Sequence, residues 1–327
     1  MAYLFRQPDL PWSFRRNLQS GVMQHCNIAH SPQRRSVLVG PDLRADRFMA
    51  CTVTLLGRLG DPPLPHSLAR MRSLNTHEIT VVLSFGGDLG FFVKQLKPEM
   101  PIVRVLKRKT SVKDIIESCG VPHPEVDLIV CNGQPVDFSF QLETDARLDI
   151  HPISTPLFPG FRLQERTVRA FIADGHLGKL ARELRLLGID VSYQNDADDR
   201  DLLAEMIQEN RALLTRDRPL LMHRVVKNGY FPRSQDPLEQ TVEVIRRFEL
   251  GQVLAPFTRC LRCNGLLSTV SKESVIEHLE PLTRLYYNDF QKCSRCGRPY
   301  WRGSHIDKLQ QRLELIMIRL DANKKPK

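Results

Sequence analysis

The pattern of apolar and polar positions predicts alternating strands and helices over residues 165–255. Apolar residues recur at the helical spacing 177, 180, 184 and 187, and Gly188 ends that helix. Further helices are expected from Asp198 or Asp199 to Asn210 and from Asp236 to about Leu250. Short apolar runs predict four strands at Val168–Ala173, Ile189–Tyr193, Ala212–Leu214 and Tyr230–Phe231. This alternation indicates an α/β fold, with a mostly parallel sheet and helices on both faces.

An earlier set of elements, over residues 76–155, has a different order. A helix capped by Thr110 or Ser111 runs through Ser118, and Gly120 ends it. Asn132-Gly133 is the strongest short signal for a hairpin turn. Strands are expected at Ile79–Phe85, Val103–Leu106, Leu128–Cys131 and Arg147–Pro152. The order β-β-α-β-β predicts a β-grasp domain of the α+β class.

The stretch IVCNGQPVDFSFQLETDARLDIHPI resembles ubiquitin-like proteins of the small sulfur-carrier type. Those carriers work through a C-terminal Gly-Gly tail. Here the chain continues through Ser154–Gly160 without such a tail. We therefore expect a docking module for a protein partner rather than a carrier.

The remaining segments complete five expected parts of the chain. Residues 1–75 hold ten arginines, no lysine and four acids, with little apolar sequence to bury. Three interpretations fit them: a disordered arginine-rich extension, a transit peptide, or sequence upstream of a start at Met71. We favour a non-essential extension. The other parts are the two domains above, a ribbon over 256–305, and a C-terminal helix and tail over 306–327.

Charge divides the chain unevenly. The net charge of the chain is +10, of which residues 1–75 contribute +6. Residues 76–160 contain 8 basic and 11 acidic residues and so contribute −3. Residues 161–327 contain 29 basic and 22 acidic residues and contribute +7. Basic segments favour polyanion partners, nucleic acid first. No apolar run approaches the roughly 18 residues that a membrane span needs. We expect a cytoplasmic protein without a membrane-spanning segment.

Four acids follow the predicted strands or begin the predicted helices of the parallel sheet. Asp174 ends the first strand, and Asp217 lies just past the third. Asp199 and Asp236 begin helices, so each could instead be a simple N-cap. Because ligands gather beyond the carboxyl ends of parallel strands, we expect these acids at one edge. Crowded carboxylates need a cation, and oxygen ligands suit Mg²⁺ or Mn²⁺.

Eight cysteines fall into two groups. Four are scattered singly, whereas Cys260, Cys263, Cys293 and Cys296 form two C-x-x-C pairs separated by 29 residues. Four thiolates on two knuckles satisfy tetrahedral Zn²⁺ and leave no open position, so the zinc is expected to be structural. Basic residues crowd the knuckles, with Tyr300 and Trp301 among them. This composition suits single-stranded RNA, although Trp301 could equally pack the ribbon onto the sheet domain.

One long stretch, FIADGHLGKLARELRLLGIDVSYQNDADDRDLLAEMIQENRALLTRDRPLL, resembles the PIN-like ribonuclease domain of the Mut-seven C-terminal RNase family. That family joins a PIN-type nuclease core to a zinc ribbon, and some members carry an N-terminal ubiquitin-like domain. The resemblance covers about residues 78–320. It implies metal-dependent RNA cleavage, with Asp174, Asp199 and Asp217 as metal-binding acids. Asp236 is the candidate for the fourth acid, and Asp198 is an alternative to Asp199.

The resulting hypothesis is a ribonuclease that hydrolyses phosphodiester bonds at an acidic Mg²⁺ or Mn²⁺ site. Five basic residues are expected to contact the RNA, namely Lys179, Arg182, Arg216, Arg218 and, from the family-like ending YWRGSH, Arg302. Two alternatives remain open. The chain could be a non-catalytic RNA-binding adaptor whose acids only cap helices. It could also be a ubiquitin-like interaction protein that uses the nuclease fold as a scaffold.

Overall fold

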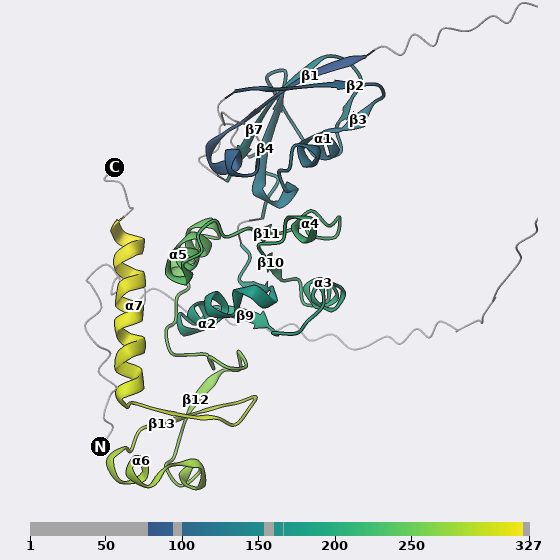
Figure 1. Ribbon diagram of the computed structural model, residues 1–327. Helices are drawn as coiled ribbons and strands as arrows, with labels where there is room; N and C mark the ends of the chain where they lie inside the picture. The colour runs from purple at the N-terminus through teal and green to yellow at the C-terminus, as the bar shows by residue number, and fades with distance from the viewer. Residues whose placement is uncertain (1–77, 94–99, 154–159, 166, 323–327) are drawn as a thin grey trace, which may run out of the picture. The chain divides into compact units, whose positions relative to one another are not determined.

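The computed structural model describes residues 78–93, 100–153, 160–165 and 167–322 (Figure 1). The extension predicted over residues 1–75 lies outside the described residues. No helix within the described ranges is both long enough and apolar enough to cross a membrane.

The first domain is built on a mixed five-stranded sheet in the order β2-β1-β7-β4-β5. These strands are β1 (Ile79–Phe85), β2 (Ile102–Leu106), β4 (Val126–Cys131), β5 (Gln134–Val136) and β7 (Ala146–Pro152). The other elements are β3 (Thr110–Ser111), β6 (Gln141–Leu142), α1 (Val112–Ser118) and the 3-10 turns η2 (Gly87–Phe91) and η3 (His123–Glu125). The first and last strands, β1 and β7, pair in parallel at the centre, while their outer neighbours are antiparallel. This arrangement is the predicted β-grasp fold.

Local sequence explains the turns and caps of this domain. Ser111 caps α1, since its side chain accepts a hydrogen bond from the Asp114 N–H. Asn132 and Gly133 have φ angles of +49° and +85°, which is the conformation that a tight β4–β5 hairpin requires. Along β1, buried and partly exposed residues alternate, so one face of the strand packs against the core.

The second domain has a four-stranded, fully parallel sheet in the order β11-β10-β8-β9. Its strands are β8 (Ala170–Ala173), β9 (Asp190–Tyr193), β10 (Ala212–Leu214) and β11 (Gly229–Tyr230). Its helices are α2 (Gly178–Leu186), α3 (Asp199–Gln208), α4 (Arg218–Leu221) and α5 (Pro237–Arg247), with 3-10 turns η4 (Gly175–Leu177) and η5 (Leu250–Gln252). The predicted α/β fold is confirmed, and the four-residue helix α4 is an element that the sequence pattern did not predict.

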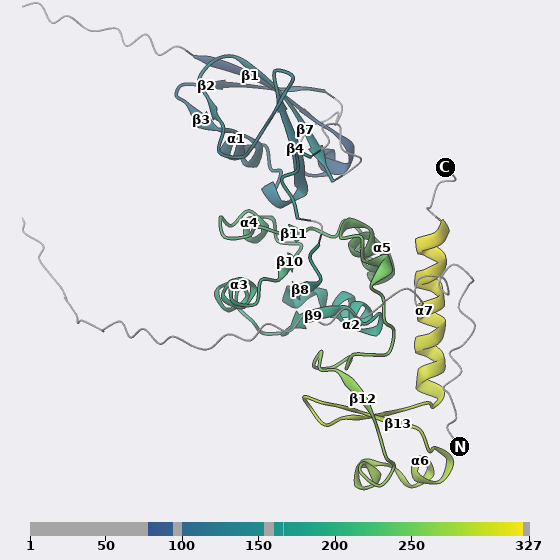
Figure 2. The ribbon, with the colours of Figure 1, turned by 180° about the vertical axis from the view of Figure 1, so that it is seen from behind.

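Side chains alternate between the two faces of this sheet, as a strand repeat of two residues demands. Ile172 and Leu213 belong to the core that contains α3 and α4. Phe171 and Leu214 belong to the core that contains α2 and α5. The ribbon views show α2 and α5 on one side of the strands and α3 and α4 on the other (Figure 2). Both faces are therefore covered, which explains why the central strands β8 and β10 are apolar throughout.

The C-terminal part contains an antiparallel three-stranded ribbon followed by one long helix. The ribbon strands are β12 (Leu267–Val270), β13 (Phe290–Cys293) and β14 (Pro299–Trp301). The long connection between the cysteine pairs holds the 3-10 turn η6 (Ile276–His278) and the helix α6 (Pro281–Tyr286). The final helix α7 (Ser304–Ala322) buries Leu313 and Ile316 in the core shared with α2 and α5. The predicted C-terminal helix is thus an outer layer of the sheet domain.

A buried polar network joins the β-grasp domain to the sheet domain. The carboxylate of Glu125, 3% exposed, accepts hydrogen bonds from the Phe231 N–H at 2.7 Å and from both terminal nitrogens of Arg233 at 2.9 and 2.8 Å. Burial raises the pKa of Glu125, while hydrogen bonds and charge from Arg233 act in the opposite direction. The Arg233 guanidinium also lies 4.6 Å from the ring centroid of Phe92. Separating a buried, paired charge from its partner is strongly destabilising. This network therefore holds the β-grasp domain against the residues that follow β11.

Candidate active site and four-cysteine ribbon

The four parallel strands end in register at one edge of the sheet. Ala173 pairs with Tyr193 and with Leu214, and Leu214 pairs with Tyr230. The Asp174 N–H donates to the Leu214 carbonyl at 3.0 Å, so the ladder extends one residue further. The residues that follow the strands therefore share one edge, which is where ligands bind in open parallel sheets.

Thr215 connects two of the predicted acids at this edge. Its hydroxyl donates to Asp174 Oδ2 at 2.8 Å and accepts from the Asp217 N–H at 2.9 Å. Thr215 is fully buried, Asp174 is partly buried and Asp217 is exposed. Because one hydroxyl serves both, the orientation of the Asp174 carboxylate is tied to the backbone at Asp217. The sheet thus brings Asp174 and Asp217 to the same place, as their positions after β8 and β10 predicted.

Two of the acids also cap helices. Asp217 is the N-cap of α4, and its Oδ1 accepts from the Leu220 N–H at 2.9 Å. Asp236 is the N-cap of α5, and its Oδ1 accepts from the Leu238 N–H at 3.3 Å. Both side chains are exposed. Capping engages one carboxylate oxygen in each case, which leaves the second oxygen as a ligand atom.

The third predicted acid could be either of two adjacent residues, Asp198 or Asp199, and the structure gives them different roles in α3. Asp198 is the N-cap of α3, because its Oδ1 accepts from the Asp201 N–H at 2.8 Å. Asp199 is the first residue of the helix and is exposed. Since α3 follows β9, Asp199 lies at the same edge of the sheet as Asp174. The cap belongs to Asp198, and the assignment of Asp199 as a metal-binding acid stays a prediction.

The donor set at this edge suits a hard divalent cation. Among the described residues, the only cluster of three or more His, Cys, Asp or Glu side chains close enough to share one ion is formed by cysteines, so the four aspartates do not converge into such a cluster. Mg²⁺ nevertheless uses one or two carboxylates and keeps several waters. Asp174 and Asp217, coupled through Thr215, fit that mode of binding.

The two arginines beside Asp217 point to aromatic side chains. Arg218 Nη1 donates to the carbonyl of Phe92 at 3.0 Å, and its guanidinium lies 5.1 Å from the Phe92 ring centroid. The Arg216 guanidinium lies 5.8 Å from the Phe231 ring centroid. Arg218 therefore holds the β-grasp domain, and these contacts compete with the RNA contact predicted for it.

The other three predicted RNA contacts are exposed. Lys179 and Arg182 lie one turn apart on α2, shortly after Asp174 along the chain. Arg302 follows β14 on the ribbon. All three are accessible to a ligand, and their role in RNA binding stays a prediction.

The four predicted cysteine ligands form one cluster. Their sulfur atoms all lie within 4.8 Å of one another. Cys260 Sγ lies 3.7 Å from Cys296 Sγ, and Cys263 Sγ lies 3.4 Å from Cys293 Sγ. A disulfide would bring sulfurs to about 2.05 Å, whereas tetrahedral zinc with Zn–S bonds of about 2.3 Å separates them by about 3.8 Å. The cluster therefore indicates a structural zinc site.

Two thiols of this cluster have pKa values that are shifted in opposite directions. Burial raises the pKa of Cys260, but hydrogen bonds from the Tyr300 hydroxyl and the backbone N–H groups of Cys263 and Arg262 outweigh it, so the net shift is downward. Burial and hydrogen bonding with Cys293 raise the pKa of Cys263. Neighbouring thiolates repel one another unless a cation compensates them. This arrangement fits a site that is completed by Zn²⁺.

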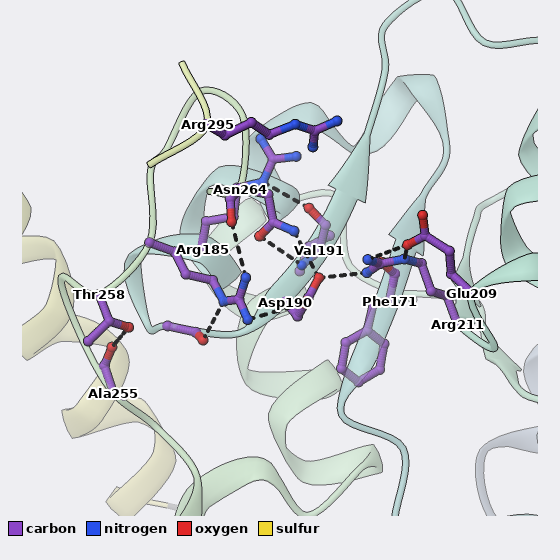
Figure 3. Close-up of polar contacts among 12 residues, drawn as sticks. Phe171, Arg185, Asp190, Val191, Glu209, Arg211, Ala255, Thr258, Asn264 and Arg295 are labelled. Atoms are coloured by element: carbon purple, nitrogen blue, oxygen red, sulfur yellow. Dashed lines mark hydrogen bonds and ion pairs between the residues drawn. The ribbon is translucent and has the colours of Figure 1, made fainter. Parts of the chain in front are cut away.

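A polar junction docks the ribbon onto β9 (Figure 3). The buried Arg185 of α2 donates to the carbonyls of Val191, Leu261 and Arg262. Asn264, in the first knuckle, accepts from the Val191 N–H at 3.2 Å and donates to Asp190 at 2.8 Å. Burial lowers the pKa of Arg185, and electrostatic interaction with the nearby Cys260 and Cys263 side chains opposes that shift.

Asp190 is the centre of this junction. Its carboxylate pairs with Arg211 at 2.6 Å and with Arg259 at 3.1 Å. Burial raises the pKa of Asp190, but hydrogen bonds from Arg211 and Asn264 and the charges of both arginines lower it below the usual value. Because this one carboxylate binds residues from the sheet and from the ribbon, the knuckle has a defined position on the sheet domain.

Several residues of the site were not predicted from the sequence. Thr215 gave a usable signal, since a hydroxyl two residues before a strand-end acid can accept from that acid's N–H. In the sequence, Arg185 looks like an ordinary charged residue on the solvent-facing side of a helix, and no neighbouring residue indicates that it is buried. Glu183 of α2 bonds to Thr241 at 3.0 Å and pairs with Arg312, 129 residues away, which only the tertiary structure reveals.

The fold and these sites define an α/β protein with an acidic strand-end site, a four-cysteine ribbon and a β-grasp domain. Residues 169–313 match the Mut7-C RNAse domain, and residues 78–157 match the Mut7-C ubiquitin domain. The chain therefore carries a Mut7-C RNase domain with an N-terminal Mut7-C ubiquitin-like domain, which confirms the family resemblance. No curated protein and no solved structure matches the chain significantly. The family implies a nuclease with a nucleic-acid substrate.

Proposed function

We propose that the chain is a metal-dependent ribonuclease whose active site is the Asp174–Thr215–Asp217 edge of the parallel sheet. The observation that carries this proposal is the Thr215 hydroxyl bridge between two strand-end acids, within a domain of the Mut7-C RNase family. Hydrolysis joins the oxygen of water to phosphorus and releases the leaving ribose oxygen with a proton. A bound Mg²⁺ or Mn²⁺ supplies the positive charge that activates water and stabilises the phosphoryl transition state.

The side chains at this edge have different roles in the proposed reaction. Asp174 and Asp217 hold the cation, Asp199 supplies a third carboxylate and Asp236 a fourth. The hydroxyl of Thr215 keeps Asp174 in one orientation. Lys179 and Arg182 hold the RNA backbone beside the acids. The zinc ribbon keeps its structural role and presents Arg302 to RNA.

A requirement for a divalent cation tests the proposed function. Purified full-length protein should cleave labelled single-stranded RNA in Mn²⁺ or Mg²⁺, and EDTA should stop the reaction. Zinc content must be measured in the same samples, because a chelator that strips the ribbon would also stop cleavage. Restoring activity with Mn²⁺ alone, at full zinc content, assigns the requirement to the carboxylate site. Absence of cleavage in every metal tested would reject the proposal.

A non-catalytic RNA-binding adaptor is the second candidate. The observation that favours it is that Asp217 and Asp236 each cap a helix. Binding of RNA without cleavage under all these conditions is the result that this candidate predicts. The protein partner expected for the ubiquitin-like domain, and the cytoplasmic location, stay predictions.

Replacing Thr215 with valine should slow RNA cleavage by about thirtyfold, since it removes two hydrogen bonds that contribute about 1 kcal/mol each. Valine keeps the shape of the buried side chain but cannot donate to Asp174 or accept from the Asp217 N–H. Thr215→Ser retains the hydroxyl and is the matched control, with cleavage close to that of the unsubstituted protein. The measurement is single-turnover cleavage at saturating Mn²⁺. Equal rates for the valine and serine variants would show that the bridge does not orient the acids.

A further inference from the structure

A cleft of about 430 Å³ lies on the outer side of α2. Lys179, Arg182 and Leu186 of α2 line it together with Leu261 of the first cysteine knuckle and Leu309 and Arg312 of α7. Positions 179, 182 and 186 fall on one face of the helix, since they are three and four residues apart. The opposite face of α2 packs Leu180 and Leu184 into the core. With Pro237 of α5, four separate parts of the chain therefore build this cleft.

The walls of the cleft are held in place by partly buried polar contacts. Glu183 pairs with Arg312 and accepts from Thr241 at 3.0 Å, which ties α7 to α2 and α5. Arg185 donates to the Leu261 carbonyl at 3.3 Å, which ties the knuckle to α2. Leu313 and Ile316 anchor α7 in the core. The cleft is therefore a preformed feature of the fold.

The cleft leads from the acidic edge to the zinc ribbon. At one end it is lined by Lys179, near Asp174 at the start of α2, and by Pro237, which directly follows Asp236. At the other end it is lined by Leu261, which directly follows the first cysteine ligand along the chain. The cleft thus runs along α2 from the start of the helix, which follows Asp174 in the chain, to the first cysteine knuckle.

The charged and apolar side chains that line the cleft indicate which kind of ligand it binds. Lys179 and Arg182 are exposed, and neither forms an ion pair with another described residue, so both cations are available for phosphate. Arg312 is neutralised by Glu183. The partly exposed Leu261 and Leu309 offer apolar surface to a base, whereas Leu186 is buried beneath them. Since single-stranded RNA is recognised by phosphate contacts combined with contacts to unstacked bases, this lining suits it. A site of a few hundred Å³ has the size of a small-ligand pocket and is too small for a duplex.

We propose that this cleft binds one nucleotide of single-stranded RNA and so leads the strand to the acidic edge. Lys179 and Arg182 contact the phosphate, and Leu261 and Leu309 pack against the base. The zinc ribbon and α7 thereby take part in substrate binding through the wall they form. This inference rests on the proposed nuclease function and specifies its substrate as unpaired RNA.

Direct binding measurements test the cleft separately from cleavage. The protein is the full chain, loaded with zinc and carrying Asp174→Asn so that the RNA stays intact, and the probe is a short fluorescent single-stranded RNA of mixed sequence. Adding Lys179→Glu and Arg182→Glu should raise the Kd by about ten- to a hundredfold. The slope of log K against log salt should fall by about one to two, as two phosphate contacts are lost. The same strand in a duplex should bind more weakly than the single strand.

Two further variants distinguish the cleft from general charge effects. Leu309→Ala should raise the Kd by about fivefold while the salt slope stays the same, since apolar surface is lost without charge. Lys107→Glu with Arg108→Glu makes the same change of net charge on the ubiquitin-like domain, where both residues are exposed. This control should leave the Kd within about twofold.

The cleft proposal and the nuclease proposal fail in different ways. A Kd unchanged by Lys179→Glu and Arg182→Glu, or raised no more than by the control pair, would overturn the cleft. Duplex binding equal to that of the single strand would overturn it too. If the cleft variants lose binding but the unsubstituted protein cleaves no RNA in any metal, the cleft stands and the nuclease assignment falls. If the cleft variants bind RNA normally and the unsubstituted protein cleaves it, the nuclease assignment stands and the cleft falls.

Discussion

Replacing Asp174 with asparagine should lower the rate of RNA cleavage by about a hundred- to a thousandfold, the loss typical when one group that stabilises charge in an active site is removed. Asparagine keeps the size of the side chain and can still accept the Thr215 hydrogen bond, so the fold should persist. What disappears is the negative charge that we propose holds the divalent cation. The measurement is single-turnover cleavage of labelled RNA across a range of Mn²⁺ concentrations, with circular dichroism and zinc content to confirm folding.

Asp149→Asn is the matched control for this prediction. Asp149 is a partly buried acid on β7 of the ubiquitin-like domain, paired with the exposed Arg147, and has no place in the proposed site. Its substitution should leave the cleavage rate within about twofold, since pairs near the surface contribute little. If the Asp174 variant cleaves as fast as the control, Asp174 is not a ligand of the catalytic cation.

Removing one zinc ligand, with Cys260→Ser, should release the metal and unfold the ribbon. Structural zinc binds with a free energy on the order of 10 kcal/mol, and this energy stabilises the folded ribbon. The ribbon has little other stabilisation, because its own apolar core is small. Among the described residues, the buried members of that core are only Val275, Leu279 and Phe290. The expected result is loss of one zinc per chain and rapid hydrogen exchange over residues 256–303. RNA binding should weaken as well, because Leu261 leaves the wall of the cleft.

Cys119→Ser serves as the control for zinc. Cys119 is also buried, 8% exposed, but lies at the end of α1, away from the cysteine knuckles. This variant should keep one zinc per chain and normal exchange in the ribbon. Lowering the pH should release zinc from the unsubstituted protein, because the ligands must lose their protons to bind it. Full zinc content in the Cys260 variant would show that the cluster is not a four-cysteine site.

Most of the fold could be predicted from short stretches of sequence. The strand at Ile79–Phe85 and the helix capped by Ser111 have the expected limits, and the parallel sheet domain has the expected alternation. Gly188 ends α2 with a φ of +83°, and a Cβ there would lie 2.1 Å from the Ala255 carbonyl oxygen, so glycine is required twice over. Such signals depend on neighbours within a few residues. The helices α4 and α6 were missed because such short helices carry no periodic pattern.

The site was predicted less completely, for a physical reason. Asp174 and Asp217 could be named because each follows a buried strand, and parallel strands end together. The orientation of Asp174 depends on Thr215, which directly follows the neighbouring strand β10 and lies 41 residues away in the sequence. Arg218 looked like a phosphate contact beside an acid, yet it donates to the Phe92 carbonyl, 126 residues away. A charged residue looks the same in a sequence whether its partner is a substrate or a distant carbonyl.

The sequence by itself determined the elements, the zinc knuckles and the acids at strand ends, because periodicity, capping and C-x-x-C spacing are local properties. Only the tertiary structure decided how these parts act together. Hydrogen bonding across the sheet joined Asp174 to Asp217 through Thr215. The buried Arg185 and the partly buried Glu183 hold the ribbon and α7 against α2. Such long-range pairs depend on how the elements pack, because a polar group that is buried without a hydrogen-bond partner destabilises the fold.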